Sequence, residues 1–322
     1  MKEIRKVLLE GEKFLLAGHV NPDGDTTGSC FALGLALSQM GKQVSVMLEP
    51  FSSSLNIIPG KELLCSADYT YTSDTVFIAL DCASPERLGN AKELFEKAKI
   101  TVCIDHHESN TGWAKYNYIE SNASSTAEMV YRLIEPITDI GRDVATAVYA
   151  GMVTDTGGFR HNATAKSTME IAAKLMEIGV PFTEVYSRLM HMHKYLEGKA
   201  LGIALSNSSL IEDGKIVYTY VNADMLKKMG AKSQHLEGTV EYLMGTRGAL
   251  IAVLVYERST VAEIKTSLRS KGPNVGNIAS KLGGGGHKLA AGATSYGSVE
   301  ETLKTALEYA VQELKEWEAL QE

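Results

Sequence analysis

Short apolar runs alternate with stretches of helical periodicity in the first half of the chain. The apolar runs are FLLAG (14–18), KQVSVML (42–48), DTVFIALD (74–81) and KITVCID (99–105). Helical stretches lie at 26–41, at 141–158, which is apolar nearly all round, and at 164–179. Continuous apolar strands that alternate with helices are typical of a parallel sheet covered on both faces. The pattern therefore predicts the α/β class, with the helix at 141–158 buried.

The second half of the chain has a different pattern. Asp213-Gly214 stands between two apolar runs, which predicts a β-hairpin. Strands are predicted at 249–257 and 261–269, and helices at 273–282 and 298–317. A polar helical stretch at 186–205 precedes this region and is the best candidate for a linker. We therefore expect a second, smaller α/β domain, joined to the first by a helical linker.

Length and charge narrow the class of protein. A chain of 322 residues suits two domains, and it has no apolar run of the roughly 20 residues that a membrane-spanning helix needs. The charged N-terminus lacks the apolar core of a secretory signal, so we expect a cytoplasmic protein without membrane contact. The net charge of −7 argues against tight binding of long nucleic acid, although residues 206–297 hold 11 Lys and Arg against 7 Asp and Glu. The four cysteines stand far apart without a CxxC pair, which predicts buried thiols.

Aspartate and histidine residues cluster where the predicted strands of the first half end. They are His19, Asp23 and Asp25, then Asp81, then Asp105, His106 and His107, and finally Asp155 after the buried helix. A single aspartate after a strand is usually a turn or helix-capping residue. Several such groups at one sheet edge would repel one another or stay unpaired unless a cation joins them. Carboxylate and imidazole together suit Mn²⁺ or a similar octahedral metal, and the pattern predicts a site for two ions with a bridging carboxylate.

These four motifs, in this order and spacing, resemble the DHH phosphoesterase superfamily. The resemblance covers about residues 1–185 and implies a parallel-sheet catalytic domain that binds two Mn²⁺-type ions. The implied ligands are His19 and Asp23 for one ion, Asp25, His106 and Asp155 for the other, and Asp81 as the bridge. Asp105 would orient a ligand histidine, and His107 would face the scissile phosphate. Hydroxide generated between the ions would attack phosphorus without a side-chain nucleophile.

A run of glycines followed by a histidine is the second constellation. Four successive glycines free the backbone to point N–H groups at an anion, although a flexible turn is the other interpretation. Arg258 and Arg269 bracket the strand TVAEIKTSLR, and arginine matches phosphate geometry. The segment GGGGHKLAAG, after TSLRSKG, resembles the DHHA1 domain over about 206–322. That resemblance implies substrate binding by Arg258, Arg269, Gly284, Gly285, Gly286 and His287.

A DHH and DHHA1 pair of this length is similar to superfamily members that act on short RNA and small nucleotides. It implies a Mn²⁺-dependent phosphohydrolase that degrades short single-stranded oligoribonucleotides to 5′-mononucleotides and converts 3′-phosphoadenosine 5′-phosphate to AMP. It also allows a homodimer. The alternatives are hydrolysis of linear or cyclic dinucleotides, and a nucleotide sensor without catalysis. The sensor would have lost a metal ligand, whereas all six implied ligands are present. The choice of Mn²⁺, Mg²⁺ or Co²⁺, the polarity of cleavage and the roles of Phe159, Arg160 and His161 stay open.

Overall fold

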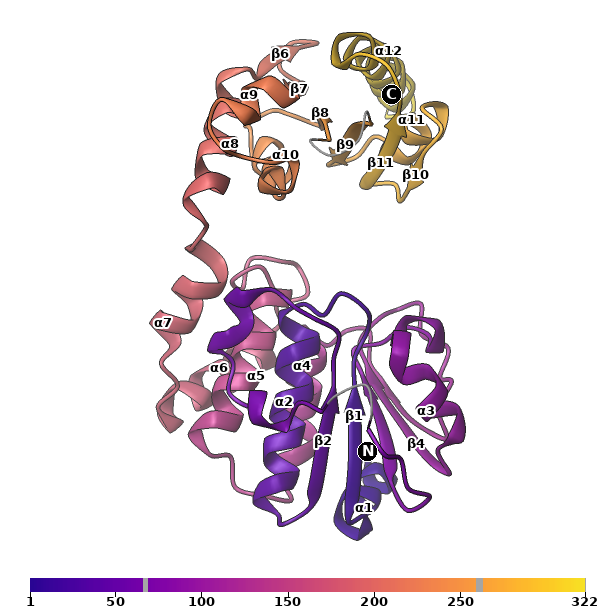
Figure 1. Ribbon diagram of the computed structural model, residues 1–322, viewed down its shortest axis with the longest axis vertical. Coiled ribbons are helices and arrows are strands. Elements are labelled where there is room, and N and C mark those ends of the chain that lie inside the picture. Colours follow the sequence, from indigo (N-terminus) through magenta and orange to yellow (C-terminus); the bar gives the residue numbers. More distant parts are fainter. Residues whose placement is uncertain (66–68, 259–262, 322) are drawn as a thin grey trace. The chain divides into compact units, whose positions relative to one another are not determined.

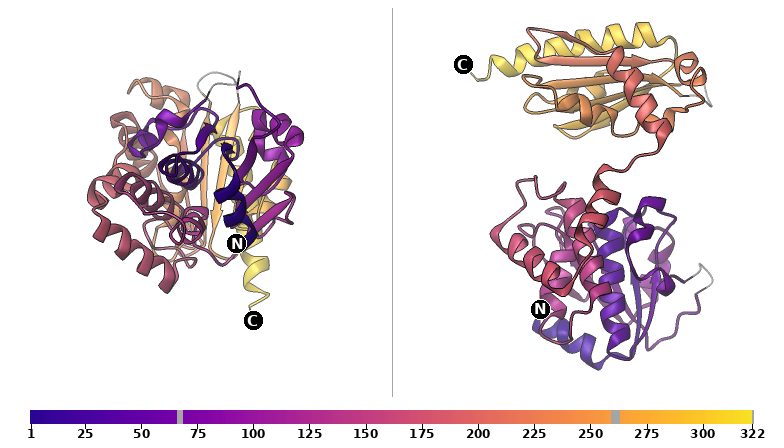
Figure 2. Two further views of the ribbon diagram at one scale, coloured as in Figure 1. Left: turned by 90° about the horizontal axis from the view of Figure 1, so that it is seen from below. Right: turned by 90° about the vertical axis from the view of Figure 1, so that its left-hand side faces the viewer.

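The computed structural model of the protein describes residues 1–65, 69–258 and 263–321, and the chain divides into two compact units. The first unit is Met1–Met192 and the second is His193–Glu322. Figures 1 and 2 show that each unit has its own sheet with helices packed against it. The division falls inside the stretch 186–205, where α7 (Phe182–Tyr186) is followed by a single π-helical turn, Ser187–His191.

The first unit contains a five-stranded sheet in the order β2-β1-β3-β4-β5, and all pairs of neighbours are parallel. Its strands are β1 (Lys13–Ala17), β2 (Gln43–Met47), β3 (Val76–Leu80), β4 (Ile100–Asp105) and β5 (Tyr116–Ile119). Phe14 and Leu16 of β1 face the larger core, whereas Leu15 and Ala17 face a smaller core on the opposite side. Both faces of the sheet are therefore buried, which explains the continuous apolar runs and confirms the predicted α/β class.

Helices cover both faces of this sheet. They are α1 (Lys2–Glu10), α2 (Gly24–Gln39), α3 (Lys92–Lys97), α4 (Thr126–Ile134), α5 (Arg142–Asp155) and α6 (Lys166–Ile178). Figure 1 shows α2, α4, α5 and α6 on one side of the sheet and α3 on the other. The residues of α5 from Val144 to Val153 are all buried, as its apolar sequence predicts.

The crossing of α2 and α5 is close because both helices carry glycine at the contact. A Cβ atom on Gly28 would lie 2.7 Å from the carbonyl oxygen of Ala147 and 2.8 Å from the nitrogen of Gly151. A side chain at Gly28 would push the two helices apart, and one at Gly151 would collide with Ala127 of α4 and the carboxylate of Asp25. This crossing holds Asp25, at the start of α2, near Asp155, at the end of α5.

The second unit contains a six-stranded mixed sheet in the order β10-β11-β9-β8-β7-β6. Its strands are β6 (Ser209–Ile211), β7 (Ile216–Val221), β8 (Ile251–Glu257), β9 (Ile264–Ser270), β10 (Gly285–Gly286) and β11 (Ala290–Ser295). Only β7 and β8 pair in parallel among these. The predicted hairpin is β6–β7, and its turn has Asp213 and Gly214 at φ values of 52° and 82°. The predicted strand at 261–269 corresponds to β9, and its residues 261–262 lie outside the described ranges.

The helices of the second unit are α8 (Tyr195–Ser206), α9 (Ala223–Lys227), α10 (Thr239–Met244), α11 (Val275–Lys281) and α12 (Val299–Glu318). One core lies between the sheet and α11 with α12, and the other lies against α8, α9 and α10. The mixed sheet and its helices confirm a second α/β domain. Among the helices that the structure describes, none combines the length and the apolar character needed to cross a membrane.

The four cysteine thiols of the chain are free, and three of them are buried in the first unit. Burial raises the pKa of Cys82 to about 12 and holds the pKa values of Cys30 and Cys103 well above the ordinary range. Cys65 is half-buried, and its pKa is raised for the same reason. The thiols therefore stay protonated at neutral pH.

Candidate metal centre and nucleotide-binding edge

The ends of three parallel strands and two helices bring the predicted metal ligands to one edge of the first sheet. β1, β3 and β4 run in the same direction, so the residues that follow them meet at the same edge. Asp23 is the N-cap of α2, and its carboxylate accepts hydrogen bonds from the N–H groups of Asp25 and Thr26, both at 3.0 Å. Asp155 is the last residue of α5 and reaches the same edge.

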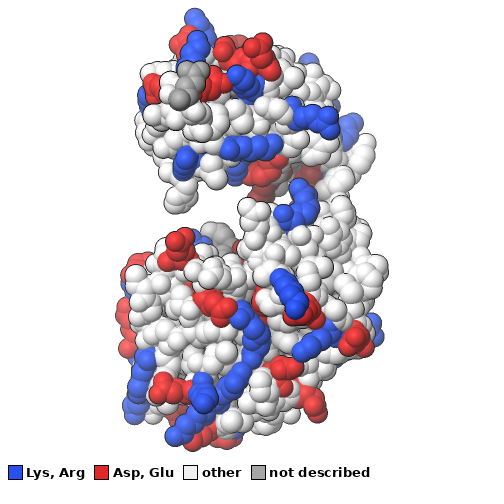
Figure 3. All heavy atoms as spheres, turned by 180° about the vertical axis from the view of Figure 1, so that it is seen from behind, with Lys and Arg blue, Asp and Glu red and all other residues white. Residues whose placement is uncertain are grey.

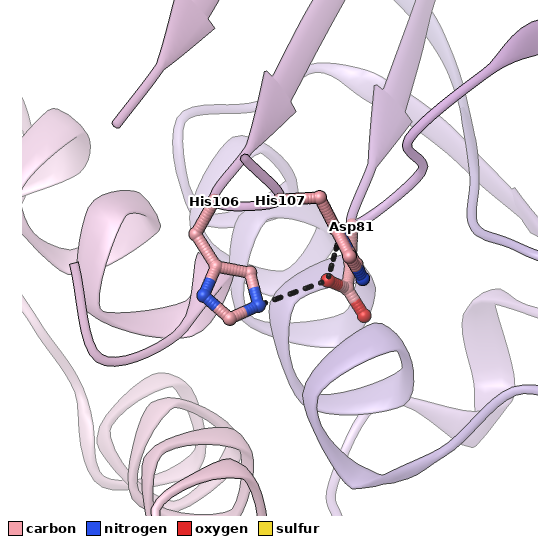
Figure 4. Close-up of side chains that lie close together, drawn as sticks. All are labelled: Asp81, His106 and His107. Carbon is pink, nitrogen blue, oxygen red and sulfur yellow. Dashed lines mark ion pairs between the residues drawn. The ribbon is translucent and has the colours of Figure 1, made fainter. Parts of the chain in front are cut away.

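The side chains at this edge form three overlapping groups whose ligand atoms lie within 4.8 Å of one another. The groups are His19, Asp23 and Asp81; Asp25, His106 and Asp155; and Asp81, His106 and His107. Figure 4 shows Asp81 facing both histidine rings. The structure thus brings all six predicted ligands together with His107, and these side chains are placed so that they can hold a metal ion.

Asp81 lies at the centre of the cluster, and its two oxygens face different partners. Oδ2 lies 3.5 Å from Nε2 of His19, whereas Oδ1 lies 3.7 Å from Nε2 of His106 and 3.6 Å from Nδ1 of His107. The Asp81 side chain is almost fully buried, and its backbone has a φ of +54°. A left-handed conformation is uncommon in residues other than glycine and clusters at functional sites.

Both candidate histidine ligands direct the same ring nitrogen at the carboxylates. Nδ1 of His19 donates to the carbonyl oxygen of Val20 at 2.7 Å, and Nδ1 of His106 donates to the carbonyl oxygen of Ala123 at 3.3 Å. These bonds select the tautomer in which Nε2 carries a lone pair. In the neutral ring that lone pair faces carboxylate oxygens, which is unfavourable unless a proton or a metal cation stands between them.

The distances within the cluster are longer than direct hydrogen bonds, and the shortest of them falls within the range expected for two ligands of one ion. Nε2 of His106 lies 3.4 Å from Asp155 and 4.0 Å from Asp25, and Nε2 of His19 lies 3.7 Å from Asp23. Hydrogen bonds of this kind measure about 2.7–3.2 Å. Two ligand atoms that each lie about 2.1 Å from one ion are separated by roughly 3.0–3.6 Å, depending on the coordination angle.

The pKa values at this edge show how strongly the site requires positive charge. Burial lowers the pKa of His19, but the carboxylates of Asp23 and Asp81 outweigh that effect and raise it to about 10. Burial raises the pKa of Asp155 to about 6, with a further increase from the charge of Asp81. Burial, and then the charges of Asp81 and Asp155, raise the pKa of Asp25 well above its ordinary range. Divalent ions would relieve the same crowding of carboxylates.

Asp105 does not orient the ligand histidine His106, in contrast to the expectation from sequence. Its Oδ1 accepts a hydrogen bond from Nδ1 of His107 at 2.7 Å, and this contact raises the pKa of His107. Its Oδ2 accepts one from Nδ2 of Asn110 at 2.6 Å, and Asn110 also donates to the carbonyl oxygen of Cys82 at 3.1 Å. Asp105 therefore fixes His107, and the buried Asn110 fixes Asp105.

Asn110 and two threonines are site residues that sequence reasoning missed. Thr26 and Thr126 each donate a hydroxyl hydrogen bond to Asp81. Thr26 directly follows the first motif, one residue after Asp25, so its neighbourhood to the motif was an available signal. Thr126 lies far along the chain from every predicted ligand, and no local pattern marks it.

The second unit brings Arg269 close to the glycine run but not Arg258. Arg269 pairs with Ala290 across β9 and β11, beside the β10–β11 pairing of Gly286 with Ala291. Arg258 lies past the end of β8, opposite Glu263 at the other end of β9, about 20 Å from Arg269 along the strand. Its guanidinium forms an ion pair with Glu263 at 3.0 Å. Arg269 likewise forms an ion pair, with Glu241 of α10.

Close packing requires glycine at two positions of this run but not at a third. A Cβ atom on Gly284 would lie 2.2 Å from the carbonyl oxygen of Gly292, and one on Gly286 would lie 2.5 Å from Cα of Ala291. Gly285 has open space at that position, and His287 is exposed in the β10–β11 turn. Close packing against β11 thus requires glycine at 284 and 286, while Gly285 and His287 are accessible to a ligand.

The segment after Asp155 has a tight backbone. Gly157, Gly158 and Phe159 have φ values of 59°, 75° and 64° in succession. The ring of Phe159 packs 6.1 Å from that of Tyr149, which favours a core role over base stacking. Arg160 is exposed, and Nδ1 of His161 donates to the carbonyl oxygen of Asp155 at 3.0 Å.

Charged side chains of both signs lie on the face of the molecule drawn in Figure 3. On the face drawn in Figure 3, basic and acidic residues are interspersed over both units. A protein that tracks long single strands needs a continuous basic groove, and that face does not present one among the residues described. This agrees with the net charge of −7.

Family models match both units. The model described as the DHH family, N-terminal domain, matches residues 13–152, and the DHHA1 domain model matches residues 213–316. The fold, the ligand cluster and these matches define the class of protein: the chain belongs to the DHH family and carries a DHHA1 domain. The resemblance inferred from the four motifs and the glycine run is thereby confirmed.

Individual relatives are similar along nearly the whole chain. The chain is 32% identical over 323 residues to the bifunctional oligoribonuclease and PAP phosphatase NrnA of Thermus thermophilus, which covers 98% of this chain and 94% of that protein. It is 26% identical to the cyclic-di-AMP phosphodiesterase PdeA of Listeria monocytogenes over 88% of this chain and 45% of that protein. A crystal structure of an exopolyphosphatase-related protein from Bacteroides fragilis superposes with a TM-score of 0.85 at 26% identity, covering 99% and 96% of the two chains.

Proposed function

We propose that this protein is a Mn²⁺-dependent phosphohydrolase that degrades short oligoribonucleotides to 5′-mononucleotides and converts 3′-phosphoadenosine 5′-phosphate to AMP. The observation that carries the proposal is the central carboxylate of Asp81. Its two oxygens face two different ligand groups, one containing His19 and the other containing His106. That arrangement suits a carboxylate shared by two ions.

The donor set fits a pair of hard or borderline divalent cations. His19 and Asp23 would hold one ion, Asp25, His106 and Asp155 the other, and Asp81 would bridge them. Four carboxylates with two imidazoles favour Mn²⁺, with Mg²⁺ and Co²⁺ as the competing choices. When bound, such ions activate a shared water for attack on phosphorus and offset charge on the phosphoryl oxygens.

His107 is proposed to act on the substrate through its second ring nitrogen. Asp105 accepts from Nδ1, so Nε2 is the nitrogen that can donate to a phosphoryl or leaving oxygen. Asp105 holds the ring in that orientation and stabilises its positive charge. Neither residue needs to form a covalent bond with phosphorus.

In the second unit, Arg269 and the accessible part of the glycine run are proposed to bind substrate. Arg269 offers a guanidinium fork, and the backbone of Gly285 and Gly286 and the exposed His287 stand beside it, whereas the N–H of Gly284 already donates to the carbonyl oxygen of Ala279 at 2.8 Å. Glu241 pairs with Nη2 of Arg269, and Nη1 donates to the carbonyl oxygen of Leu268, so a substrate phosphate that binds Nη2 must displace Glu241. Arg258 lies at the other end of β9, so it would bind a different part of the substrate from Arg269.

The substrate class is supported by the relative named as an oligoribonuclease and PAP phosphatase, which matches 98% of this chain. The acidic net charge agrees with substrates that need only a few phosphate contacts. The second candidate function is hydrolysis of linear or cyclic dinucleotides. The similarity to PdeA supports it, although the match covers only 45% of that protein.

A phosphate-release assay with 3′-phosphoadenosine 5′-phosphate tests the proposal. We expect AMP and inorganic phosphate with Mn²⁺, and no turnover with EDTA. Asp81→Ala should abolish turnover, whereas Asp143→Ala, an exposed aspartate in the first turn of α5, should match the wild type. Hydrolysis of cyclic dinucleotides alone would move the protein to the second candidate, and equal activity of Asp81→Ala and wild type would refute the metal site.

We also propose that the protein forms a homodimer, and this part of the proposal rests only on the family resemblance. Light scattering coupled to size-exclusion chromatography tests it directly, because a single chain has a mass of 34.9 kDa. A mass of one chain at working concentration would remove the dimer from the proposal and leave the chemistry unaffected.

A further inference from the structure

We propose that Thr126 is a positioning residue of the metal centre. It hydrogen-bonds Asp25, a proposed ligand of one ion, and Asp81, the proposed ligand shared by both ions. Thr126 is the first residue of α4 and is fully buried. Its N–H donates to Oδ2 of Asp25 at 2.7 Å, and its hydroxyl donates to Oδ1 of Asp81 at 3.2 Å. The inference rests on the proposed function, because Asp25 and Asp81 are there taken as metal ligands.

Asp81 is held by a hydroxyl on each of its oxygens. Oδ2 accepts from Thr26 at 2.6 Å on the side that faces His19, and Oδ1 accepts from Thr126 on the side that faces His106. A carboxylate oxygen has two lone pairs, so one hydroxyl leaves the other lone pair for an ion. The two threonines therefore fix the rotation of the carboxylate without blocking it as a bridge.

Asp25 is held by the same helix end. Its Oδ1 accepts from the N–H of Ala127 at 2.9 Å, beside the bond from Thr126 to Oδ2. The start of α4 thus supplies two N–H groups to a buried carboxylate, and the partial positive charge of the helix terminus favours that carboxylate. Thr126 is the residue of α4 that contacts both Asp25 and Asp81.

The start of α4 is itself fixed by a buried carboxylate. Glu128 is almost fully buried and accepts hydroxyl hydrogen bonds from Ser124 and from Thr168 of α6, the latter at 2.8 Å. Ser125 caps the helix by accepting from the N–H of Glu128 at 3.0 Å. A rigid support of this kind gives the hydroxyl of Thr126 a defined position, which a positioning residue requires.

A substitution at Thr126 can remove the hydroxyl while keeping the rest of the side chain. Thr126→Val keeps the shape and keeps the N–H bond to Asp25, but loses the bond to Asp81. Thr126→Ser keeps the hydroxyl and loses only a methyl group. Thr146→Val is the matched control, because Thr146 is a buried threonine of α5 whose hydroxyl donates to the carbonyl oxygen of Arg142 at 2.7 Å, away from the cluster.

The test is calorimetric titration of the metal-free full-length variants with Mn²⁺, together with electron paramagnetic resonance of the protein loaded with two Mn²⁺ per chain. We expect Thr126→Val to bind at least one ion about 10–100-fold more weakly, the usual effect of losing a residue that orients a ligand. The spin-coupled signal of a bridged pair should weaken with it. Thr126→Ser and Thr146→Val should stay close to the wild type in both measurements.

Two results would overturn the inference. The first is that Thr126→Val binds Mn²⁺ as tightly as Thr146→Val does. The second is that Thr126→Ser and Thr126→Val lose the same affinity for Mn²⁺, because the hydroxyl would then be irrelevant. If Thr126→Val does not fold, Thr26→Val removes the matching hydroxyl on Oδ2, and unchanged Mn²⁺ binding there would contradict the inference. A wild type that binds no Mn²⁺ would refute both proposals. A wild type that binds two ions yet hydrolyses no nucleotide would refute only the proposed substrates.

Discussion

Replacing Asn110 by alanine should damage both folding and turnover, because Asn110 holds the aspartate that holds His107. Its Nδ2 donates to Oδ2 of Asp105 at 2.6 Å and to the carbonyl oxygen of Cys82 at 3.1 Å. Asp105 is fully buried, so it depends on donors inside the fold. Losing a hydrogen bond to a charged acceptor costs about 1.5–3 kcal/mol. At about 2–4 °C per kcal/mol for a unit of this size, the melting temperature should fall by roughly 3–12 °C.

The same loss should lower kcat more than it changes KM. If the 1.5–3 kcal/mol appears in the transition state, in which His107 carries its charge beside Asp105, kcat falls by roughly 10–150-fold. Phosphate release from 3′-phosphoadenosine 5′-phosphate measures kcat and KM, and differential scanning calorimetry measures the melting temperature. Asn110→Asp separates hydrogen bonding from packing, because it keeps the shape but presents an acceptor to Asp105.

Asn117→Ala is the matched control for this prediction. Asn117 lies on β5, is exposed, and its side chain hydrogen-bonds the backbone of Ala114, away from the cluster. We expect it to leave kcat unchanged. The reasoning is refuted if Asn110→Ala behaves like Asn117→Ala, or if Asn110→Asp retains the kcat of the wild type at neutral pH.

Four further predictions concern metal, substrate and thiols. Mn²⁺ at 100 times its dissociation constant should stabilise the first unit by about 2.7 kcal/mol per ion, so EDTA should lower the melting temperature; an equal melting temperature with and without metal would contradict this. Arg269→Ala should raise KM with little change in kcat, whereas the exposed Arg247→Ala should change neither; an unchanged KM in Arg269→Ala would exclude that arginine from binding. Cys65 should react first with a thiol reagent in the native protein, because the other three thiols are buried with raised pKa values. Because a raised folded pKa favours the protonated thiol, the unfolding free energy should decrease as pH rises above about 8.5, the unfolded value; a stability that rises with pH in that range would contradict it.

The metal cluster could be predicted from sequence because its members follow strands or helices that end at one place. The apolar runs before Asp81 and Asp105 are continuous, which marks buried parallel strands, and such strands bring their carboxyl ends to one edge. The chemistry of carboxylate with imidazole then pointed to a metal. Helices 26–41, 141–158, 164–179 and 298–317 were also found, each within three residues at its ends.

The supporting residues could not be predicted, because their roles come from contacts distant in sequence. Thr126 lies 101 residues from Asp25, and nothing in its own segment marks that contact. Asn110 stands in a segment that reads as an ordinary turn, and only the fold brings its side chain to Asp105. Strand β5 has only four residues, half-exposed, which is too short for a periodic signal.

The placement of Arg258 shows a limit of grouping residues by motif. Residues that bracket a strand lie at its opposite ends, so Arg258 and Arg269 could not both adjoin one short glycine run. The spacing of the two arginines along the chain already contained this information. The role predicted for Asp105 differed for another reason, since either neighbouring histidine was within reach and only the hydrogen bond to His107 decides between them.

A product assay on RNA of graded length tests the central claim most directly. Labelled RNAs from dimers to 24-mers would be incubated with the Mn²⁺-loaded protein, with Asp81→Ala as the blank. The account predicts 5′-mononucleotides released fastest from the shortest RNAs, with rates that fall as length increases. Mn²⁺ bound in the wild type without release of mononucleotides from any of these RNAs would contradict it.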